Sequence, residues 1–178
     1  MKHHLAGWIG EHLGCCVQRP STEAEGRPSA AIDRRLRRES VVLLGAAAGD
    51  EPPELVPTWF SWDGALLWVF APHDEAWVAS LRSRPRVMLA LGDPEQGGDV
   101  QLIEGEASLL STPTSRALTD IHRAKYADRL AERGEEWPQY AAAHPRAVVI
   151  RPTRYLRWPA HQAPTAPAPG PTLAVTAG

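Results

Sequence analysis

The 178-residue sequence has few cysteines, little net charge and no long apolar run. Its two cysteines, Cys15 and Cys16, are adjacent, so they cannot join distant segments in the usual disulfide geometry, and a reducing cytoplasm is expected. The formal net charge of −2 at pH 7 gives no electrostatic basis for binding nucleic acid or an anionic membrane. No segment is apolar for long enough to form a signal peptide or a membrane span. We therefore expect a soluble, cytoplasmic protein.

The length fits one domain with a substantial core. We predict an N-terminal appendage and linker over residues 1–30, one folded domain over residues 31–160, and a disordered tail rich in proline and alanine over residues 161–178. Within the first segment, residues 18–29 are predicted to be the linker because they are polar and contain proline and glycine.

The most informative stretch is residues 55–70, LVPTWFSWDGALLWVF, which is rich in aromatic side chains. An Asp63-Gly64 pair between two strand-like runs is a strong hairpin signal, and it predicts a type I′ turn with positive φ at both residues. The flanking strands are expected over residues 54–62 and 65–71. Because large apolar side chains occur on both faces, the hairpin should be buried in a barrel or against a second subunit.

The remaining elements follow from hydrophobic periodicity and capping residues. Further strands are predicted over residues 40–47, 87–91, 100–110 and 147–150, with residues 154–158 as an extension. Helices are predicted over residues 30–38, 75–83 and 137–143, the second of them capped by Asp74. The longest helix is expected to start at Thr112-Pro113, to bury Leu118, Ile121 and Leu130, and to end at Gly134.

Six short strands joined mostly by tight turns indicate a mainly β fold with helices, of the α+β class: a six-stranded antiparallel barrel with helices on its ends. A doubly wound parallel sheet does not fit, because the turns are too short for crossover connections.

Other groups of chemically active side chains show no specific pattern. The segment that holds His3, His4, His12, Cys15 and Cys16 has no standard zinc spacing, so no metal site is predicted. Glu104 and Glu106 share one face of a strand and are interpreted as structural. No serine lies in a recognisable nucleophile motif; the serines considered are Ser61, Ser80 and Ser108.

Four segments in order resemble the split-barrel flavin and deazaflavin family related to pyridoxamine 5′-phosphate oxidase: LVPTWFSWDG, EAWVASLRSRPRVMLAL, GGDVQLIEGEASLL and VVIRPTRYLRW. The resemblance runs from about Ile32 to Trp158 and is strongest to the actinobacterial deazaflavin-dependent reductases. It implies a homodimeric split barrel that holds coenzyme F-420 or FMN in a groove at the subunit interface. The implied activity is hydride transfer between the reduced cofactor and an unsaturated small molecule.

The resemblance also implies which residues contact the cofactor. The strand beside the cofactor ring corresponds to Val56, Pro57, Thr58, Trp59 and Phe60. The hydroxyl and the lysine that usually hold the phosphate are replaced by Ala71 and Trp77, at a helix start that suits an anion. Asp74 and Glu75 bring negative charge to this place, and His73 and Arg82 are the nearby cations that can compensate.

These replacements leave two classes of function open. The first is an oxidoreductase that uses a deazaflavin or flavin. The second is a split-barrel protein with a degenerate phosphate site, which binds a small molecule as an accessory protein or uses another cofactor such as haem. The candidate haem ligands are His73, His122, His144 and His161, and the sequence does not distinguish among them.

Overall fold

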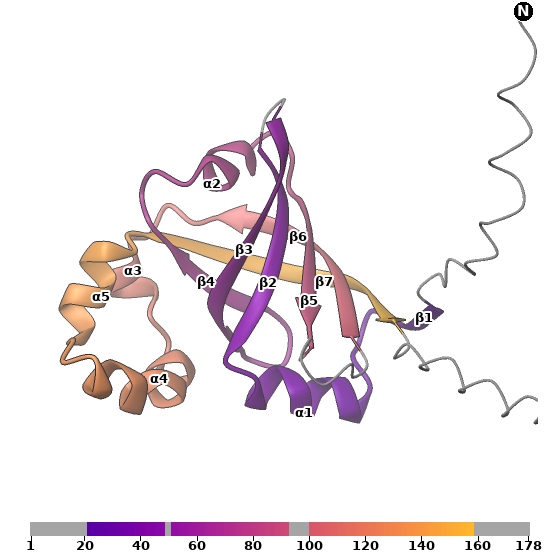
Figure 1. Cartoon of the computed structure of the whole chain (residues 1–178), viewed down its shortest axis with the longest axis horizontal. Coiled ribbons are helices and arrows are strands. Elements are labelled where there is room, and N and C mark those ends of the chain that lie inside the picture. Colours follow the sequence, from indigo (N-terminus) through magenta and orange to yellow (C-terminus); the bar gives the residue numbers. More distant parts are fainter. Residues whose placement is uncertain (1–20, 49–50, 93–99, 159–178) are drawn as a thin grey trace, which may run out of the picture.

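The computed structural model describes residues 21–48, 51–92 and 100–158. The strands are β1 (Ser21–Glu25), β2 (Val41–Ala48), β3 (Glu51–Trp62), β4 (Leu67–Ala71), β5 (Arg86–Leu91), β6 (Val100–Leu109) and β7 (Arg146–Trp158). The helices are α1 (Ala30–Arg38), α2 (Ala76–Ser80), α3 (Thr114–Ala117), α4 (Asp120–Glu132) and α5 (Trp137–Ala143). Figure 1 shows α1 at one end of a barrel, α2 at the other end, and α3, α4 and α5 grouped on one side.

Strands β2 to β7 form an antiparallel barrel of six strands. The strand order is β7-β4-β3-β2-β5-β6, and a further pairing between β6 and β7 closes the sheet on itself. Closure pairs β6 with β7, which would otherwise be the two edge strands of the sheet. The predicted fold class and its six-stranded antiparallel barrel are therefore confirmed.

Strand β1 lies in the segment predicted to be a linker, and that prediction is wrong for its residues. It pairs antiparallel with β7, from Ser21 opposite Arg157 to Glu25 opposite Arg154. β4 pairs with one edge of β7 as far as Ile150. β1 pairs with that same edge farther along the strand. The strand was missed because STEAE lacks the apolar alternation from which strands are predicted.

The β3–β4 hairpin buries side chains on both faces, as predicted. Phe60 and Trp62 point into the barrel, where they join the main core together with Leu67 and Val69. On the outer face, a second apolar cluster forms under α3, α4 and α5; from the hairpin it includes Trp59, Trp68 and Phe70. Burial of one such side chain contributes on the order of 1.5–3 kcal/mol, so the hairpin links the barrel to its helical cover.

The turn of this hairpin differs from the type I′ turn that was predicted. Gly64 has a φ of +101°, but no non-glycine residue of the described chain has positive φ. The loop has four residues, because Trp62 pairs with Leu67. The Asp63 carboxylate accepts from the backbone N–H of Ala65 at 2.9 Å and of Leu66 at 2.8 Å, which closes the turn with Asp63 at negative φ.

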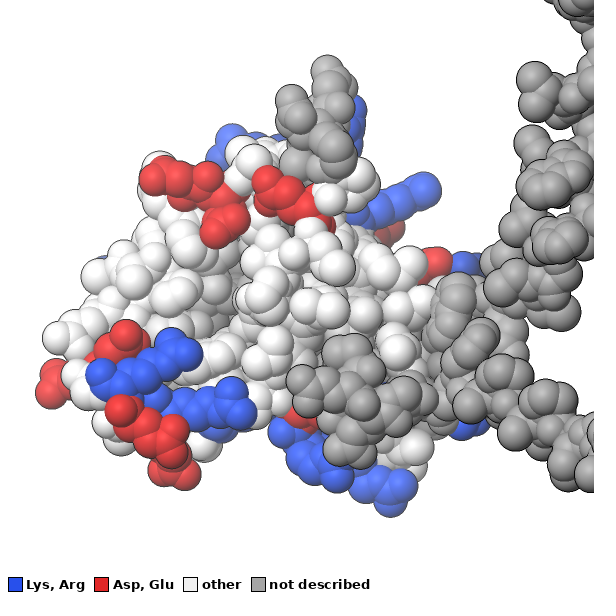
Figure 2. Space-filling model, in the orientation of Figure 1, with Lys and Arg blue, Asp and Glu red and all other residues white. Residues whose placement is uncertain are grey.

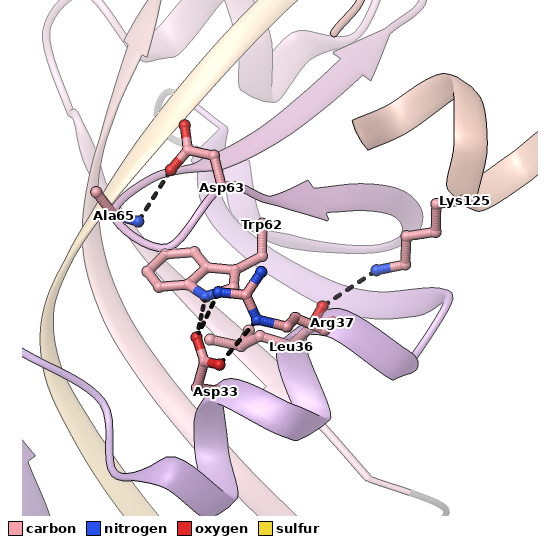
Figure 3. A network of polar contacts seen from close by, with 7 residues as sticks. All are labelled: Asp33, Leu36, Arg37, Trp62, Asp63, Ala65 and Lys125. Carbon is pink, nitrogen blue, oxygen red and sulfur yellow. Dashed lines mark hydrogen bonds and ion pairs between the residues drawn. The ribbon is translucent and has the colours of Figure 1, made fainter. Parts of the chain in front are cut away.

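Helix α1 is held to the barrel by a polar network (Figure 3). The indole N–H of Trp62 donates to Asp33 Oδ1 at 2.8 Å, and Arg37 donates to Asp33 Oδ2 at 2.8 Å. Lys125 of α4 reaches the same helix and donates to the carbonyl oxygen of Leu36 at 3.1 Å. The bonds from Arg37 and then Trp62 hold the pKa of the Asp33 carboxyl below its ordinary value.

The long helix predicted from Thr112-Pro113 is divided in two. Pro113 is the N-cap of the four-residue α3, and the chain is extended at Leu118 before α4 begins. Thr119 caps α4, because its side chain accepts from the N–H of His122 at 3.1 Å.

The division turns different residues inward. Ile121, predicted to be buried, is 44% exposed, whereas His122, Tyr126 and Leu130 form the buried side of α4. The predicted end at Gly134 is confirmed, with a φ of +66° directly after the C-cap.

Helix α2 is shorter than predicted, and Asp74 does not cap it. Glu75 is the N-cap and makes no side-chain capping bond, while the Asp74 carboxylate pairs with His73 instead. The Ser80 hydroxyl donates back to the carbonyl oxygen of Trp77 at 2.8 Å. Such a bond competes with continuation of the helix, which explains its early end.

Candidate functional site

The candidate site lies where β3 separates from β4. These strands pair only at residues 60–62 of β3, whereas β2 accompanies β3 over almost its whole length. Residues 56–59 of β3 therefore have a strand partner on one edge and none on the other. The free edge lines a pocket of about 240 Å³, here called the edge pocket. Its other walls are Phe70, Ala71, Pro72, Glu75, Trp77, Arg133, Tyr140 and His144.

The structure divides the predicted site residues among three places. The edge pocket is lined by Val56, Pro57, Thr58, Trp59, Ala71 and Trp77. Phe60 points into the barrel and is fully buried, because neighbouring side chains on a strand face opposite ways. His73 and Arg82 line a different pocket, between α2 and the start of β7.

Trp59 is held in one orientation by aromatic and cationic neighbours. Its ring is stacked on Tyr126 with 4.4 Å between ring centroids and on Tyr140 with 5.8 Å. The guanidinium carbon of Arg133 lies 4.9 Å from the Trp59 ring centroid, which is a cation–π distance. Trp59, which forms one wall of the edge pocket, is thus held in place by α4 and α5.

A buried polar group lies behind this wall. His122 is fully buried, with Nδ1 at 3.3 Å from the Ser61 hydroxyl and Nε2 at 3.3 Å from the Tyr140 hydroxyl. Burial, and then the positive charge of Lys125, lowers the pKa of His122 to about 3. Burial also raises the pKa of Tyr140. Both side chains therefore stay neutral near pH 7.

Ser61 and His122 form a serine–histidine pair that the sequence did not reveal. The two residues are far apart in the chain and come together only because α4 packs on β3. Both are buried, Ser61 at 1% exposure and His122 at 0%, so no substrate can reach the Ser61 oxygen. The third partner is Tyr140 rather than a carboxylate, and the pair is structural.

Tyr126 ties α4 to β3 next to the free edge. Its hydroxyl oxygen accepts from the backbone N–H of Phe60 at 3.0 Å. The same oxygen lies 2.7 Å from the carbonyl oxygens of Ser40 and Phe60, to one of which its proton is donated. Burial raises the pKa of Tyr126, so the hydroxyl keeps this proton.

The lining of the edge pocket includes residues that were not predicted as cofactor contacts. Arg133 lies directly after α4 and, like Glu75, lines the pocket. Trp77, a predicted site residue, is 1% exposed, and its buried Nε1–H has no hydrogen-bond partner among the described residues. Arg133 and Tyr140 were not predicted to line the site, and His144 was considered only as a candidate haem ligand, because only packing of α4 and α5 on β3 brings them there.

The remaining candidates do not form a site. Glu104 pairs with Arg154 at 2.7 Å and Glu106 pairs with Arg151, which agrees with a structural role. Within residues 21–48, 51–92 and 100–158, no group of three His, Cys, Asp or Glu side chains is placed to hold a metal ion. The N-terminal histidines and cysteines, and His161, lie outside the described residues.

No family model matches the chain, and no curated protein matches it in sequence. Several solved structures share its fold. An F420 reductase is 21% identical with a TM-score of 0.52, over 69% of this chain and 94% of that chain. A Clostridium acetobutylicum protein of the pyridoxinephosphate oxidase family is 13% identical with a TM-score of 0.50, over 72% of this chain and 92% of that one. The chain has the pyridoxamine 5′-phosphate oxidase-like split-barrel fold.

The same split barrel occurs in a protein with another printed role. HutZ, the haem storage protein of Vibrio cholerae, is 13% identical with a TM-score of 0.50, over 72% of this chain and 90% of that chain. At such identities the likeness defines the fold, and function must be argued from the residues of the site. Across the described part of the chain, no helix has the length and apolar character needed to cross a membrane.

Proposed function

We propose that the protein is an oxidoreductase that binds a deazaflavin or flavin, coenzyme F-420 or FMN, in the edge pocket. There it transfers a hydride between the reduced cofactor and an unsaturated small molecule. The observation that carries this proposal is the free edge of β3 at residues 56–59, which faces a pocket walled by Trp59 and Trp77. Solved structures with the same fold include an F420 reductase, which supports the choice of cofactor class.

The residues of the edge pocket fit such a cofactor. A planar ring with several oxygen and nitrogen atoms along its edge needs backbone partners, and the unpaired edge of β3 provides them. The unpartnered Nε1–H of Trp77 is a further donor for a ring oxygen or a phosphate oxygen. Arg133 is the cation that would bind the cofactor phosphate. Glu75 repels the phosphate, and the attraction of Arg133 exceeds this repulsion only where its guanidinium contacts the phosphate directly.

The chemistry of the reaction comes from the cofactor when it is bound, since a reduced flavin or deazaflavin is a hydride donor. The protein binds the cofactor and orients it. Trp59 is fixed by Tyr126 and Arg133, so the wall does not have to reorganise on binding. His122 is buried behind Trp59 and stays neutral, so the charge on this side of the pocket comes from Arg133.

The same proposal includes a homodimer. The outer face of β2, β3 and β5 exposes Val41 at 43%, Leu43 at 38%, Leu55 at 64% and Met88 at 37%. Figure 2 shows that the centre of this face carries no charged side chain. Leu43 lies opposite Pro57 and Val41 opposite Trp59, so the apolar face continues into the edge pocket. A second copy on this face would enlarge a pocket that is smaller than most ligand sites.

A titration tests the proposal. Purified protein is titrated with coenzyme F-420, FMN and haem while tryptophan fluorescence is followed, since Trp59 and Trp77 both line the pocket. We expect F-420 or FMN to bind with a Kd below about 100 μM, which is about −5.5 kcal/mol. Arg133→Gln should weaken that binding about tenfold. Arg129→Gln is the matched control, because Arg129 is also exposed on α4 but does not line the pocket. Failure of both cofactors to bind by 100 μM would rule out the oxidoreductase.

Haem binding is the second candidate, and His144 is the observation in its favour. His144 lines the edge pocket, and its Nδ1–H donates to the carbonyl oxygen of Tyr140 at 3.0 Å. This bond leaves Nε2 as the nitrogen that can coordinate iron. Of the other described histidines, His73 and His122 have both ring nitrogens engaged. If haem is the ligand, His144→Ala will remove the haem absorption band, and F-420 and FMN will not compete with haem.

A further inference from the structure

We propose that the pocket between α2 and the start of β7, here called the α2 pocket, is a second ligand site. It would bind the anionic group, phosphate or carboxylate, of a small organic molecule. The pocket has a volume of about 310 Å³ and is lined by His73, Val78, Ala79, Arg82, Leu109 and Arg146. None of these residues lines the edge pocket, so the two pockets are distinct in their lining.

One side of the α2 pocket is a cation that is already oriented. Arg146 donates to Nε2 of His73 at 2.9 Å, because a guanidinium cannot accept a hydrogen bond. Nδ1 of His73 therefore carries the proton and donates to the Asp74 carboxylate at 2.7 Å. This chain fixes the His73 ring and one amino group of Arg146, and the other Arg146 donors are available to a ligand. An oriented guanidinium loses little conformational entropy when it binds an anion.

The second cation, Arg82, has no carboxylate to neutralise it. Arg82 is exposed and has no ion pair or hydrogen bond among the described residues. The acidic residues before α2 are not in the lining of the α2 pocket: Glu75 lines the edge pocket, and Asp74 pairs with His73. Two guanidinium groups and an imidazole thus face one cavity without a carboxylate in its lining. An anion with two or three oxygens can accept from both arginines at once.

The rest of the lining is apolar and selects for an organic ligand over a bare ion. Val78 is buried, Leu109 is half-buried, and Ala79 adds a methyl group beside them. A phosphate or carboxylate at the arginines would place its attached carbon atoms against this wall. Consecutive residues of α2 separate the two pockets, since Trp77 lines the edge pocket and Val78 lines the α2 pocket. The anion can belong to a separate molecule or to the far end of a ligand held in the edge pocket.

Calorimetric titration with phenyl phosphate and inorganic phosphate tests this site. We expect phenyl phosphate to bind more tightly than inorganic phosphate, and to shift the ring ¹⁵N signals of His73. Arg82→Gln and Arg146→Gln should each weaken phenyl phosphate at least tenfold, and Arg82→Lys should recover part of the loss. Arg38→Gln, at the exposed end of α1 on the other side of the barrel, should change nothing (Figure 1). Circular dichroism confirms that each variant is folded.

Two results would overturn the assignment. One is an absence of phenyl phosphate binding up to about 10 mM, weaker than any specific site of this size. The other is a loss of binding in Arg133→Gln with full binding in Arg82→Gln, which would place the anion in the edge pocket. Addition of FMN then identifies the source of the anion. If FMN displaces phenyl phosphate, the FMN phosphate reaches the α2 pocket, and if both bind together, the ligand is a separate molecule.

Discussion

The ring of Trp59 lies parallel to the ring of Tyr126, with 4.4 Å between their centroids and 2° between their planes. Trp59 belongs to the free edge of β3 and Tyr126 to the buried face of α4. The contact therefore joins the helical cover to the part of β3 that does not pair with β4. It holds the Trp59 wall of the edge pocket in one orientation.

Tyr126→Phe should destabilise the protein while leaving the stack on Trp59. Removal of the hydroxyl leaves the buried N–H of Phe60 without its acceptor, at a cost of about 1–3 kcal/mol in the free energy of unfolding. Denaturant unfolding measures this loss. Tyr155→Phe is the matched control, because the Tyr155 hydroxyl is buried and has no partner among the described residues. Equal losses in the two variants would show that the Tyr126 bonds contribute nothing specific.

Comparison of Trp77→Phe with Trp62→Phe should separate ligand binding from stability. Both tryptophans are buried in the main core, so each substitution removes the same volume and leaves a cavity. The Nε1–H of Trp77 has no partner among the described residues, whereas the Trp62 N–H donates to Asp33, so Trp62→Phe should cost more stability. Only Trp77→Phe should weaken the affinity for F-420 or FMN, by about tenfold. An unchanged cofactor affinity in Trp77→Phe would mean that this N–H does not contact the ligand.

The sequence predicted the barrel well because strand patterns and turn residues are local. The aromatic hairpin, the apolar run of residues 87–91 in β5 and the helix end at Gly134 each follow from a few neighbouring residues. β1 escaped prediction because its residues, STEAE, lack the apolar alternation of a strand. The break between α3 and α4 was missed because it lies at Leu118 and Thr119, and the capping role of Thr119 was not weighed against a single helix start at Thr112-Pro113.

The site was harder to predict because three of its twelve lining residues, Arg133, Tyr140 and His144, are distant in sequence from the others. The run of residues 56–59 was found from its resemblance to a known strand, and the structure places it at the pocket. Arg133 and His144 reach the same pocket only through the packing of Tyr126 and Tyr140 on Trp59. Periodicity shows which face of a helix is buried, but not what that face covers.

Stability should fall as the pH is lowered through the range in which unfolded histidine gains a proton. The folded pKa of His122 is about 3 and the ordinary value is 6.5, so the unfolded state binds more protons between these values. The stabilisation from neutral His122 is present above pH 6.5 and is lost towards pH 3, by at most about 1.4 kcal/mol per pH unit.

His122→Gln should remove most of this dependence. Unfolding free energies measured between pH 7 and about pH 5 isolate the histidine, because the Asp33 and Asp63 carboxyls have folded pKa values below their ordinary ones and respond only at lower pH. His73→Gln serves as the control, since the His73 side chain is largely exposed. A slope that is the same in all three proteins would contradict a neutral, buried His122.

Gly105→Ala should disturb the closure of the barrel. A Cβ atom at residue 105 would lie 2.8 Å from Cγ2 of Ile150 and 3.1 Å from the carbonyl oxygen of Arg151, which is closer than real Cβ contacts. The register of β6 against β7 already shifts between Glu104 and Gly105, so the strands have little room to separate. We expect a loss of about 1–3 kcal/mol by denaturant unfolding. Gly45→Ala, where the nearest atom is 3.5 Å away, should cost clearly less.

Leu43→Glu tests whether a second copy covers the outer face of β2, β3 and β5. Leu43 is 38% exposed, so a single chain tolerates the charge, whereas a dimer would bury it without a partner. We expect the wild-type protein to sediment as a dimer and Leu43→Glu as a monomer that binds FMN more weakly. Ile121→Glu is the control, because Ile121 is 44% exposed on α4, away from that face. A wild-type protein that sediments as a monomer at micromolar concentration would remove the dimer from the proposal, and the edge pocket would then have to bind its ligand unaided.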